Sequence, residues 1–170
     1  AETLDKIREG GWDYVILQEN LMLGVLSPDD FLKSARTLDR VVREVGGKTV
    51  LLMLWGSKYD ARVTVDTQAD VVREIGKKLD VTVVPIGPAW RLAMQENPDL
   101  RLYESGSDAA GLHGSYLNAA VLTAALINVD PSQSAYLPHD AEGEPLMTQE
   151  DAQLLRRVAW QAVMARNAEP

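Results

Sequence analysis

The feature that most constrains the fold is a set of three short apolar runs, separated from one another by segments of helical periodicity. The runs lie at residues 14–18 ("YVILQ"), 49–55 ("TVLLMLW") and 81–86 ("VTVVPI"). Continuous apolar strands that alternate with helices are typical of a parallel sheet with helices on both faces. We therefore expect an α/β fold in which these three runs form one parallel sheet.

The segments between the runs carry helix signals. Ser27 is placed to cap a helix whose first residue is Pro28, and Thr148 is placed to cap the last helix, with Asp151 three residues later. Apolar residues then recur at helical spacing in each segment. The expected helices cover residues 3–9, 28–45, 64–79, 87–96, 113–127 and a last stretch after 148.

Composition excludes several classes of function. The 170 residues fit a single domain, 1–170, and the net charge of −8 with scattered Lys and Arg argues against a nucleic-acid or anionic-membrane partner. No cysteine is present, which excludes disulfides, thiolate nucleophiles and cysteine metal sites. No phosphate-binding loop follows any strand, and the two histidines form no metal-ligand pattern. We expect no cofactor and no metal, and no compartment follows from the sequence.

A ligand site is expected where the strands end, because open parallel sheets bind ligands outside the carboxyl ends of their strands. The segments at these ends are 18–20, 56–58 and 87–90. We expect Asn20, Gly56 and Gly87 to line one cleft, which the loop before His113 could join.

Three blocks resemble the SGNH hydrolases of the GDSL esterase superfamily in their order and spacing. They are "WDYVILQEN" followed by a helical segment, "VVPIGPAW", and "GSYLNAAVLTAAL", and the likeness runs from about residue 7 to residue 160. The resemblance implies a three-layer αβα sandwich of flavodoxin-like type with a short parallel sheet. It also implies ester cleavage by a serine nucleophile, an asparagine that donates to the oxyanion, and a histidine base oriented by an aspartate.

The residues of this family transfer only in part. Asn20 stands where the oxyanion asparagine is expected, although it could simply turn the chain after a strand. His113 is the candidate base, and Asp108, five residues earlier, is the candidate orienting carboxylate. An alignment anchored on "GSYLNA" instead places the family's histidine on Ala109 and its aspartate on Gly106. His113 would then be an ordinary residue near the start of a helix.

The serine block of the family, G-[DN]-S, does not occur before residue 12. The serines near the expected site are Ser57, Ser105, Ser107 and Ser115, and none of them has a role that the resemblance transfers. The resemblance implies a carboxylic ester hydrolase acting on small acyl or acetyl esters, including esters of carbohydrates. The alternative is a non-catalytic domain that keeps the fold and a ligand cleft. A flavodoxin-like cofactor or receiver domain would need a phosphate loop or an acidic cluster that the sequence lacks.

In the family, the strand that carries the serine lies next to the strand that ends at Asn20. Without it, the strand at 14–18 would have an unpaired edge, which is a template for another chain. We expect a second copy to cover this edge in a homodimer, or the helix at 3–9 to pack over it.

Other conspicuous residues have structural interpretations. Trp55, Trp90 and Trp160 fall on core-like positions. His139 lies in a Pro-rich loop and is expected to be exposed, although this loop could reach a site as a flap.

Overall fold

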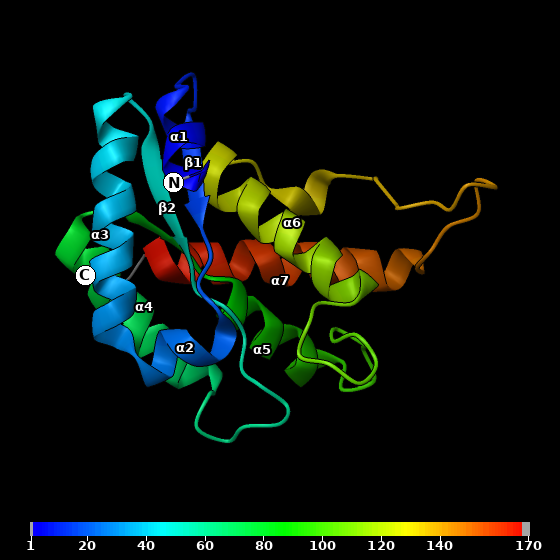
Figure 1. Ribbon diagram of the computed structural model, residues 1–170. Coiled ribbons are helices and arrows are strands. Elements are labelled where there is room, and N and C mark those ends of the chain that lie inside the picture. The colour runs from blue at the N-terminus through cyan, green and yellow to red at the C-terminus, as the bar shows by residue number, and fades with distance from the viewer. Residues whose placement is uncertain (1, 168–170) are drawn as a thin grey trace. The chain divides into compact units, whose positions relative to one another are not determined.

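The computed structural model describes residues 2–167. These residues form two compact units, Ala1–Val84 and Pro85–Pro170, which are described separately (Figure 1). No helix among the described residues has both the length and the apolar character that crossing a membrane would require.

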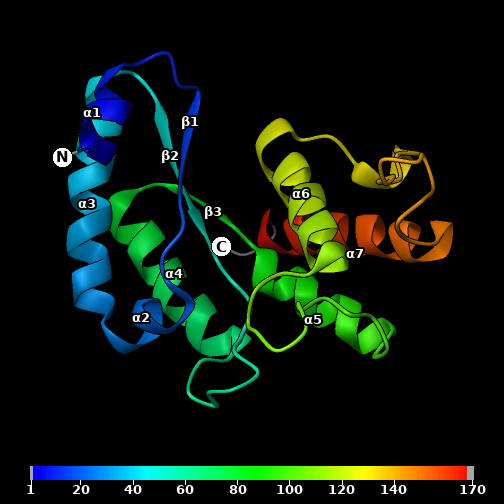
Figure 2. The ribbon, with the colours of Figure 1, turned by 45° about the vertical axis from the view of Figure 1, so that its right-hand side comes forward.

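The first unit contains the whole sheet, which confirms the predicted parallel arrangement of three strands. The strand order is β1-β2-β3, and Val50 of β2 lies opposite Ile16 of β1 and Thr82 of β3 (Figure 2). The elements of this unit are α1 (Glu2–Arg8), β1 (Tyr14–Leu17), α2 (Leu21–Leu26), α3 (Pro28–Glu44), β2 (Lys48–Leu52), α4 (Val65–Leu79) and β3 (Thr82–Val84).

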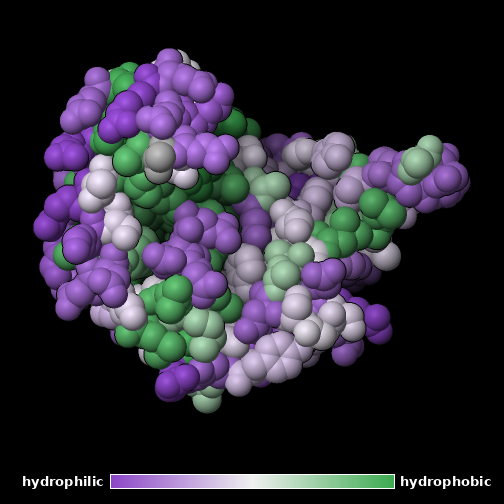
Figure 3. All heavy atoms as spheres, in the orientation of Figure 1, coloured by the Kyte–Doolittle hydropathy of each residue, from purple (hydrophilic) through white to green (hydrophobic). Residues whose placement is uncertain are grey.

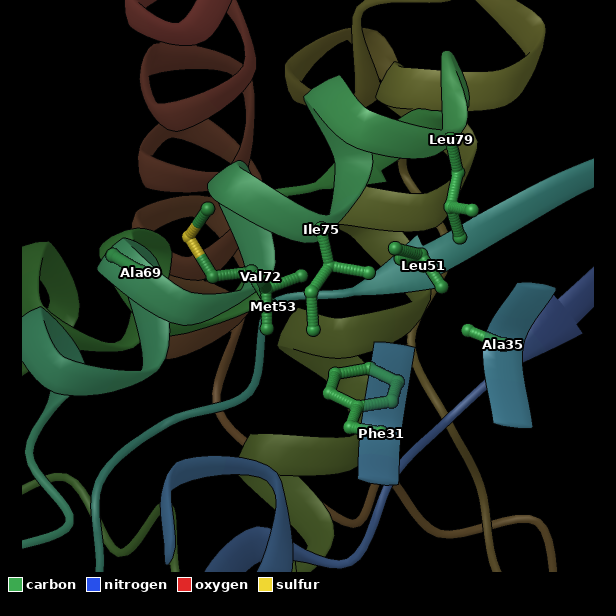
Figure 4. Close-up of a cluster of buried hydrophobic side chains, with 8 residues drawn as sticks. All are labelled: Phe31, Ala35, Leu51, Met53, Ala69, Val72, Ile75 and Leu79. Carbon is green, nitrogen blue, oxygen red and sulfur yellow. The ribbon is translucent and has the colours of Figure 1, made fainter. Parts of the chain in front are cut away.

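The core of the first unit lies where α3 and α4 pack against one face of β2. Leu51 and Met53 meet Phe31 of α3 and Ile75 of α4 in a buried cluster (Figure 4). Gly76 permits this packing, because a Cβ at that position would overlap the Val83 side chain of β3. The apolar stripes seen in the sequence therefore face the sheet, as expected for helices that cover a parallel sheet.

The expectation that helices cover both faces of the sheet is wrong for β1. Tyr14 and Ile16 are 38% and 44% exposed, whereas Val15 and Leu17 are partly buried. The reason is the place of β1 in the sheet, since it is an edge strand that pairs with β2 alone among the described residues. Helix α1 packs through Ile7 onto α3 and contacts the face of β1 that carries Val15, so it leaves Tyr14 and Ile16 uncovered.

The second unit is helical. It contains α5 (Ile86–Glu96), α6 (Leu112–Ile127), a short 3-10 helix η1 (Pro131–Gln133) and α7 (Gln149–Asn167). Trp90 of α5 is fully buried and donates from Nε1 to Asn118 Oδ1 of α6 at 2.7 Å. Gly114 lies against this ring, where a Cβ would come within 2.6 Å of a Trp90 ring carbon. A glycine is therefore required where α6 crosses α5.

Of the two predicted helix caps, one is confirmed and one is wrong. Asp151 N donates to Thr148 Oγ1 at 3.0 Å, and Thr148 Oγ1 donates to Asp151 Oδ2 at 2.8 Å. Ser27 makes no side-chain cap, because it also ends α2, where its N–H donates to Leu23 O. Ending one helix and starting the next fixes its backbone at φ −138° and ψ 61°, outside the extended geometry of an ordinary N-cap.

Two of the three tryptophans that were expected in the core are buried. Trp55 is 8% exposed and Trp90 is fully buried, whereas Trp160 is only half-buried on α7. His139 is exposed in the loop before α7, as predicted.

Candidate functional site

Asn20 links β1 to α2 and acts as the N-cap of that helix. Its Oδ1 accepts from Met22 N at 3.0 Å and from Leu23 N at 3.3 Å. The residue is exposed, and the structure records no hydrogen bond from Nδ2 to another described residue. The observed role of Asn20 is therefore to turn the chain and cap α2 through Oδ1. Its Nδ2 is the atom that could donate to a ligand.

The end of β2 forms a second tight turn in the first unit. Ser57 Oγ accepts from Tyr59 N and Asp60 N, each at 3.0 Å. The guanidinium of Arg62 hydrogen-bonds the Asp60 carboxylate and lowers the pKa of that carboxyl to about 2. Ser57 is therefore a turn residue with its oxygen engaged by the backbone.

The expected cleft of Asn20, Gly56 and Gly87 stays a prediction. Asn20 and Gly56 belong to the first unit, whereas Gly87 lies in the first turn of α5 in the second unit. Both glycines are buried, and a Cβ on Gly56 would approach Val63 O to 2.9 Å.

His113 stands in the first turn of α6 and lies beside a carboxylate of α7. Its Nε2 is 3.6 Å from Asp151 Oδ2, and the two side chains are 21% and 23% exposed. The hydroxyl of Thr148 donates to that same Asp151 oxygen and so fixes its position. The second unit therefore holds a half-buried imidazole with a positioned carboxylate, which is an arrangement that can orient a general base.

Asp108, the aspartate that the sequence pointed to, lies in the turn before α6. Burial and the nearby charge of Asp108 together raise the pKa of Tyr103. Ser107 Oγ accepts from Ala109 N at 3.1 Å, and Gly106 has a φ of +76°, so this segment is a compact turn. The ion-pair partner of His113 among the described residues is Asp151, and the catalytic role of Asp108 stays a prediction.

Sequence reasoning could not associate Asp151 with His113. The capping pattern of Thr148 and Asp151 was visible, because a cap is a contact between residues three apart. The contact with His113 instead depends on how α6 and α7 pack, which no local pattern encodes.

No hydroxyl of a described serine hydrogen-bonds to His113. Ser107 and Ser57 accept from the backbone in turns, and Ser115 is exposed on α6 two residues after His113. Among the described residues there is also no group of three or more His, Cys, Asp or Glu side chains that could hold a metal ion.

Each unit also carries a cavity that sequence reasoning missed. In the first unit, a groove of about 980 Å³ lies between α1 and β1. In the second, a cavity of about 470 Å³ lies between α6, η1 and α7, with the buried Arg156 in its wall. The sequence shows only two arginines, Arg156 and Arg157, between Leu155 and Val158 of α7, and it does not indicate which of them is buried.

Neither models of known protein families nor curated protein sequences match this chain. Among solved structures, the chain is similar to the crystal structure of a DUF4886 family protein from Bacteroides uniformis. The TM-score is 0.80 at 15% sequence identity, over 99% of this chain and 68% of that chain. At this identity the likeness concerns the fold, so the chain has the fold of that DUF4886 family protein.

Proposed function

We propose that this chain is a carboxylic ester hydrolase that acts on small acyl or acetyl esters, including esters of carbohydrates. The observation that carries the proposal is the pair formed by His113 and Asp151, with 3.6 Å between Nε2 and Oδ2. The pair is partly exposed, so a substrate can approach the imidazole, and Thr148 holds the carboxylate in place. Such a pair matches the base and orienting acid of serine-type acyl transfer.

In this mechanism Asp151 accepts from Nε2–H of His113, which leaves Nδ1 as the ring nitrogen that takes a proton. A serine hydroxyl loses its proton to Nδ1 as its oxygen attacks the ester carbonyl. The resemblance to SGNH hydrolases assigns the N–H donor for the tetrahedral oxyanion to Nδ2 of Asn20. The imidazolium then protonates the leaving alcohol, and water releases the acyl group as a carboxylic acid. Catalytic hydrogen bonds are often long without substrate, so 3.6 Å is compatible with this role.

Hydrolysis of p-nitrophenyl acetate by the purified chain tests the proposal. His113→Gln should lower kcat by about 10³-fold or more, since loss of a triad member leaves only residual catalysis. His139→Gln is the matched control, because His139 is exposed in a loop and should not change the rate. A folded His113→Gln variant with more than about a tenth of the wild-type rate would exclude His113 as the base.

The nucleophile can be found independently. A fluorophosphonate reagent should label one serine, and peptide mass spectrometry should identify it. Labelling should be lost in the His113→Gln variant, because the serine is activated by the imidazole.

The second candidate is a non-catalytic domain that binds a ligand without turning it over. It is favoured by the fact that no described serine hydroxyl hydrogen-bonds to His113. This candidate predicts no hydrolysis and no labelling, together with calorimetric binding of an acetylated sugar that His113→Gln weakens.

A further inference from the structure

Arg156 is a buried cation in the second unit. It is 2% exposed and lies on α7. Its Nη1 donates to Tyr116 Oη and to the carbonyl oxygen of Tyr136, each at 2.9 Å. Tyr116 Oη in turn donates to the same carbonyl oxygen at 2.8 Å. These neutral acceptors hold one nitrogen of the guanidinium in a fixed orientation.

The charge of Arg156 has no carboxylate partner among the described residues. Its Nε is fully buried and makes no hydrogen bond. The neighbouring Arg157 shows the contrast, since it forms a bidentate pair with Glu96 at 2.8 and 2.6 Å although it is far more exposed. A buried charge without a counter-ion costs several kcal/mol, so it marks a position where an anion would be stabilising.

Arg156 lines the cavity of about 470 Å³ between α6, η1 and α7. This volume lies within the roughly 300–1,000 Å³ of small-molecule sites. Most of the wall is apolar or aromatic, and the rings of Tyr116 and Tyr136 stack with their centroids 6.5 Å apart. Ala119, Ala120, Val129 and Pro131 complete the apolar part of the wall, and its other polar members are Thr123, Asp130, Gln133 and Ser134.

We propose that this cavity binds a small organic carboxylate with a flat, apolar body. The planar guanidinium of Arg156 matches a carboxylate group, and neither its Nη2 nor its buried Nε has a hydrogen-bond partner among the described residues. The apolar wall and the two tyrosine rings accommodate the body of the ligand. This site is independent of ester hydrolysis at His113.

Asp130 adds a negative charge to the same cavity and so disfavours ligands that carry more than one negative charge. It lines the same cavity, and its Oδ1 accepts from Ser132 N at 2.9 Å. Hydrogen bonds from Ser132 and Gln133 lower the pKa of this carboxyl, so it stays ionised at neutral pH. A phosphate dianion would meet this negative charge, whereas a monocarboxylate places its one charge at Arg156.

Isothermal titration calorimetry on the whole chain tests the site, with sodium benzoate as the probe. Benzamide has the same shape without the charge, and inorganic phosphate is an anion without an apolar body. Benzoate should bind at least about tenfold more tightly than benzamide, because a hydrogen bond to a charged acceptor is stronger than one to a neutral acceptor. It should also bind more tightly than phosphate.

Matched variants assign the binding to Arg156. Arg156→Met keeps the length of the side chain and removes its charge, and benzoate affinity should fall at least about tenfold. Arg157→Met is the control on the next residue and should leave benzoate affinity unchanged. Should Arg156→Met fail to fold, Thr123→Phe fills the cavity from α6, leaves Arg156 intact and should also abolish binding.

Three results would overturn the proposal. The first is the absence of benzoate binding up to about 10 mM. The second is unchanged benzoate affinity in folded Arg156→Met or Thr123→Phe. The third is benzamide or phosphate binding as tightly as benzoate.

Discussion

The side chain of Asn20 has two ends that can be tested separately. Its oxygen caps α2, and its nitrogen is the proposed donor to the oxyanion. Asn20→Asp keeps the capping oxygen and removes the N–H donor, so stability should change little while ester hydrolysis falls about 10²–10³-fold. Urea denaturation and p-nitrophenyl acetate kinetics measure the two effects. An aspartate variant with full activity would assign Asn20 to capping alone.

Asn20→Ala is the companion variant, because it removes both functions. Loss of the cap should cost about 1 kcal/mol of the free energy of unfolding. A larger loss of stability would mean that the residue does more for the fold than cap α2.

Glu96 ties α5 to α7 and makes stability depend on pH. The hydrogen bond from Arg157 is the main cause that lowers the pKa of the Glu96 carboxyl below its ordinary value of 4.5. A lowered folded-state pKa contributes stability that is present above 4.5 and is lost as the pH falls through the folded value. Glu96→Gln should therefore be less stable than the wild type at pH 7, and the difference should vanish at low pH.

Urea denaturation at pH 7 and at about pH 3 compares the two proteins. Glu150→Gln is the control, since Glu150 is exposed on α7 and forms no ion pair with another described residue. A difference for Glu96→Gln that is the same at both pH values would show that the carboxylate charge is not involved.

At the residue scale, the sequence predicted local contacts and missed distant ones. The cap of α7 by Thr148 was predictable, because both partners lie within one helical turn. The pairs of His113 with Asp151 and of Arg156 with Tyr116 were not, because each joins two helices whose packing has no local signature. Such contacts make up most of the candidate sites, so the sites were less predictable than the elements.

At the scale of elements, the crossing of α5 and α6 depends on one glycine. A Cβ on Gly114 would overlap Leu102 O and the Trp90 ring, and neither the backbone nor the fully buried ring can move away easily. Gly114→Ala should therefore destabilise the protein by about 1–3 kcal/mol, despite the higher helix propensity of alanine. Thermal unfolding measures the change. Ser115→Ala, at the next and exposed position, should change stability little, and equal effects at both positions would contradict the packing argument.

The strands show why element identity was easier to predict than burial. Three apolar runs gave three parallel strands, because backbone pairing suits any run of β-branched and aliphatic residues. The same composition occurs in β2, which is buried, and in β1, which is half exposed. Position within the sheet depends on strand order, which the composition of a single strand does not encode.

At the scale of the whole molecule, the exposed edge of β1 is a surface through which two copies of the chain could associate. Trp12, Tyr14 and Ile16 are 38%, 38% and 44% exposed, and they line the groove of about 980 Å³ beside α1. Figure 3 shows a hydrophobic hollow next to α1 and β1, bordered by hydrophilic atoms. The strand carries no Lys or Pro, which are the residues that commonly protect an exposed edge from another strand.

We propose that a second copy of this chain pairs with β1 across a two-fold axis. An antiparallel pairing centred on Val15 places Tyr14 opposite Ile16 of the second copy, so that these exposed side chains share one face of the joined sheet. This register brings no like charges together. A register centred on Ile16 would instead place Asp13 opposite Glu19, two like charges. A register centred between two residues would pair the exposed face of one strand with the partly buried face of the other.

Ile16→Lys should therefore convert a dimer into a monomer, because it places a charge in the middle of the paired edge. Multi-angle light scattering at micromolar concentration should give twice the chain mass of 18.7 kDa for the wild type and the single mass for the variant. Leu23→Lys is the matched control, since Leu23 is 54% exposed on α2 and does not line the groove. It should remain dimeric. A monomeric wild type would refute the pairing, and a monomeric Leu23→Lys variant would move the interface from β1 to α2.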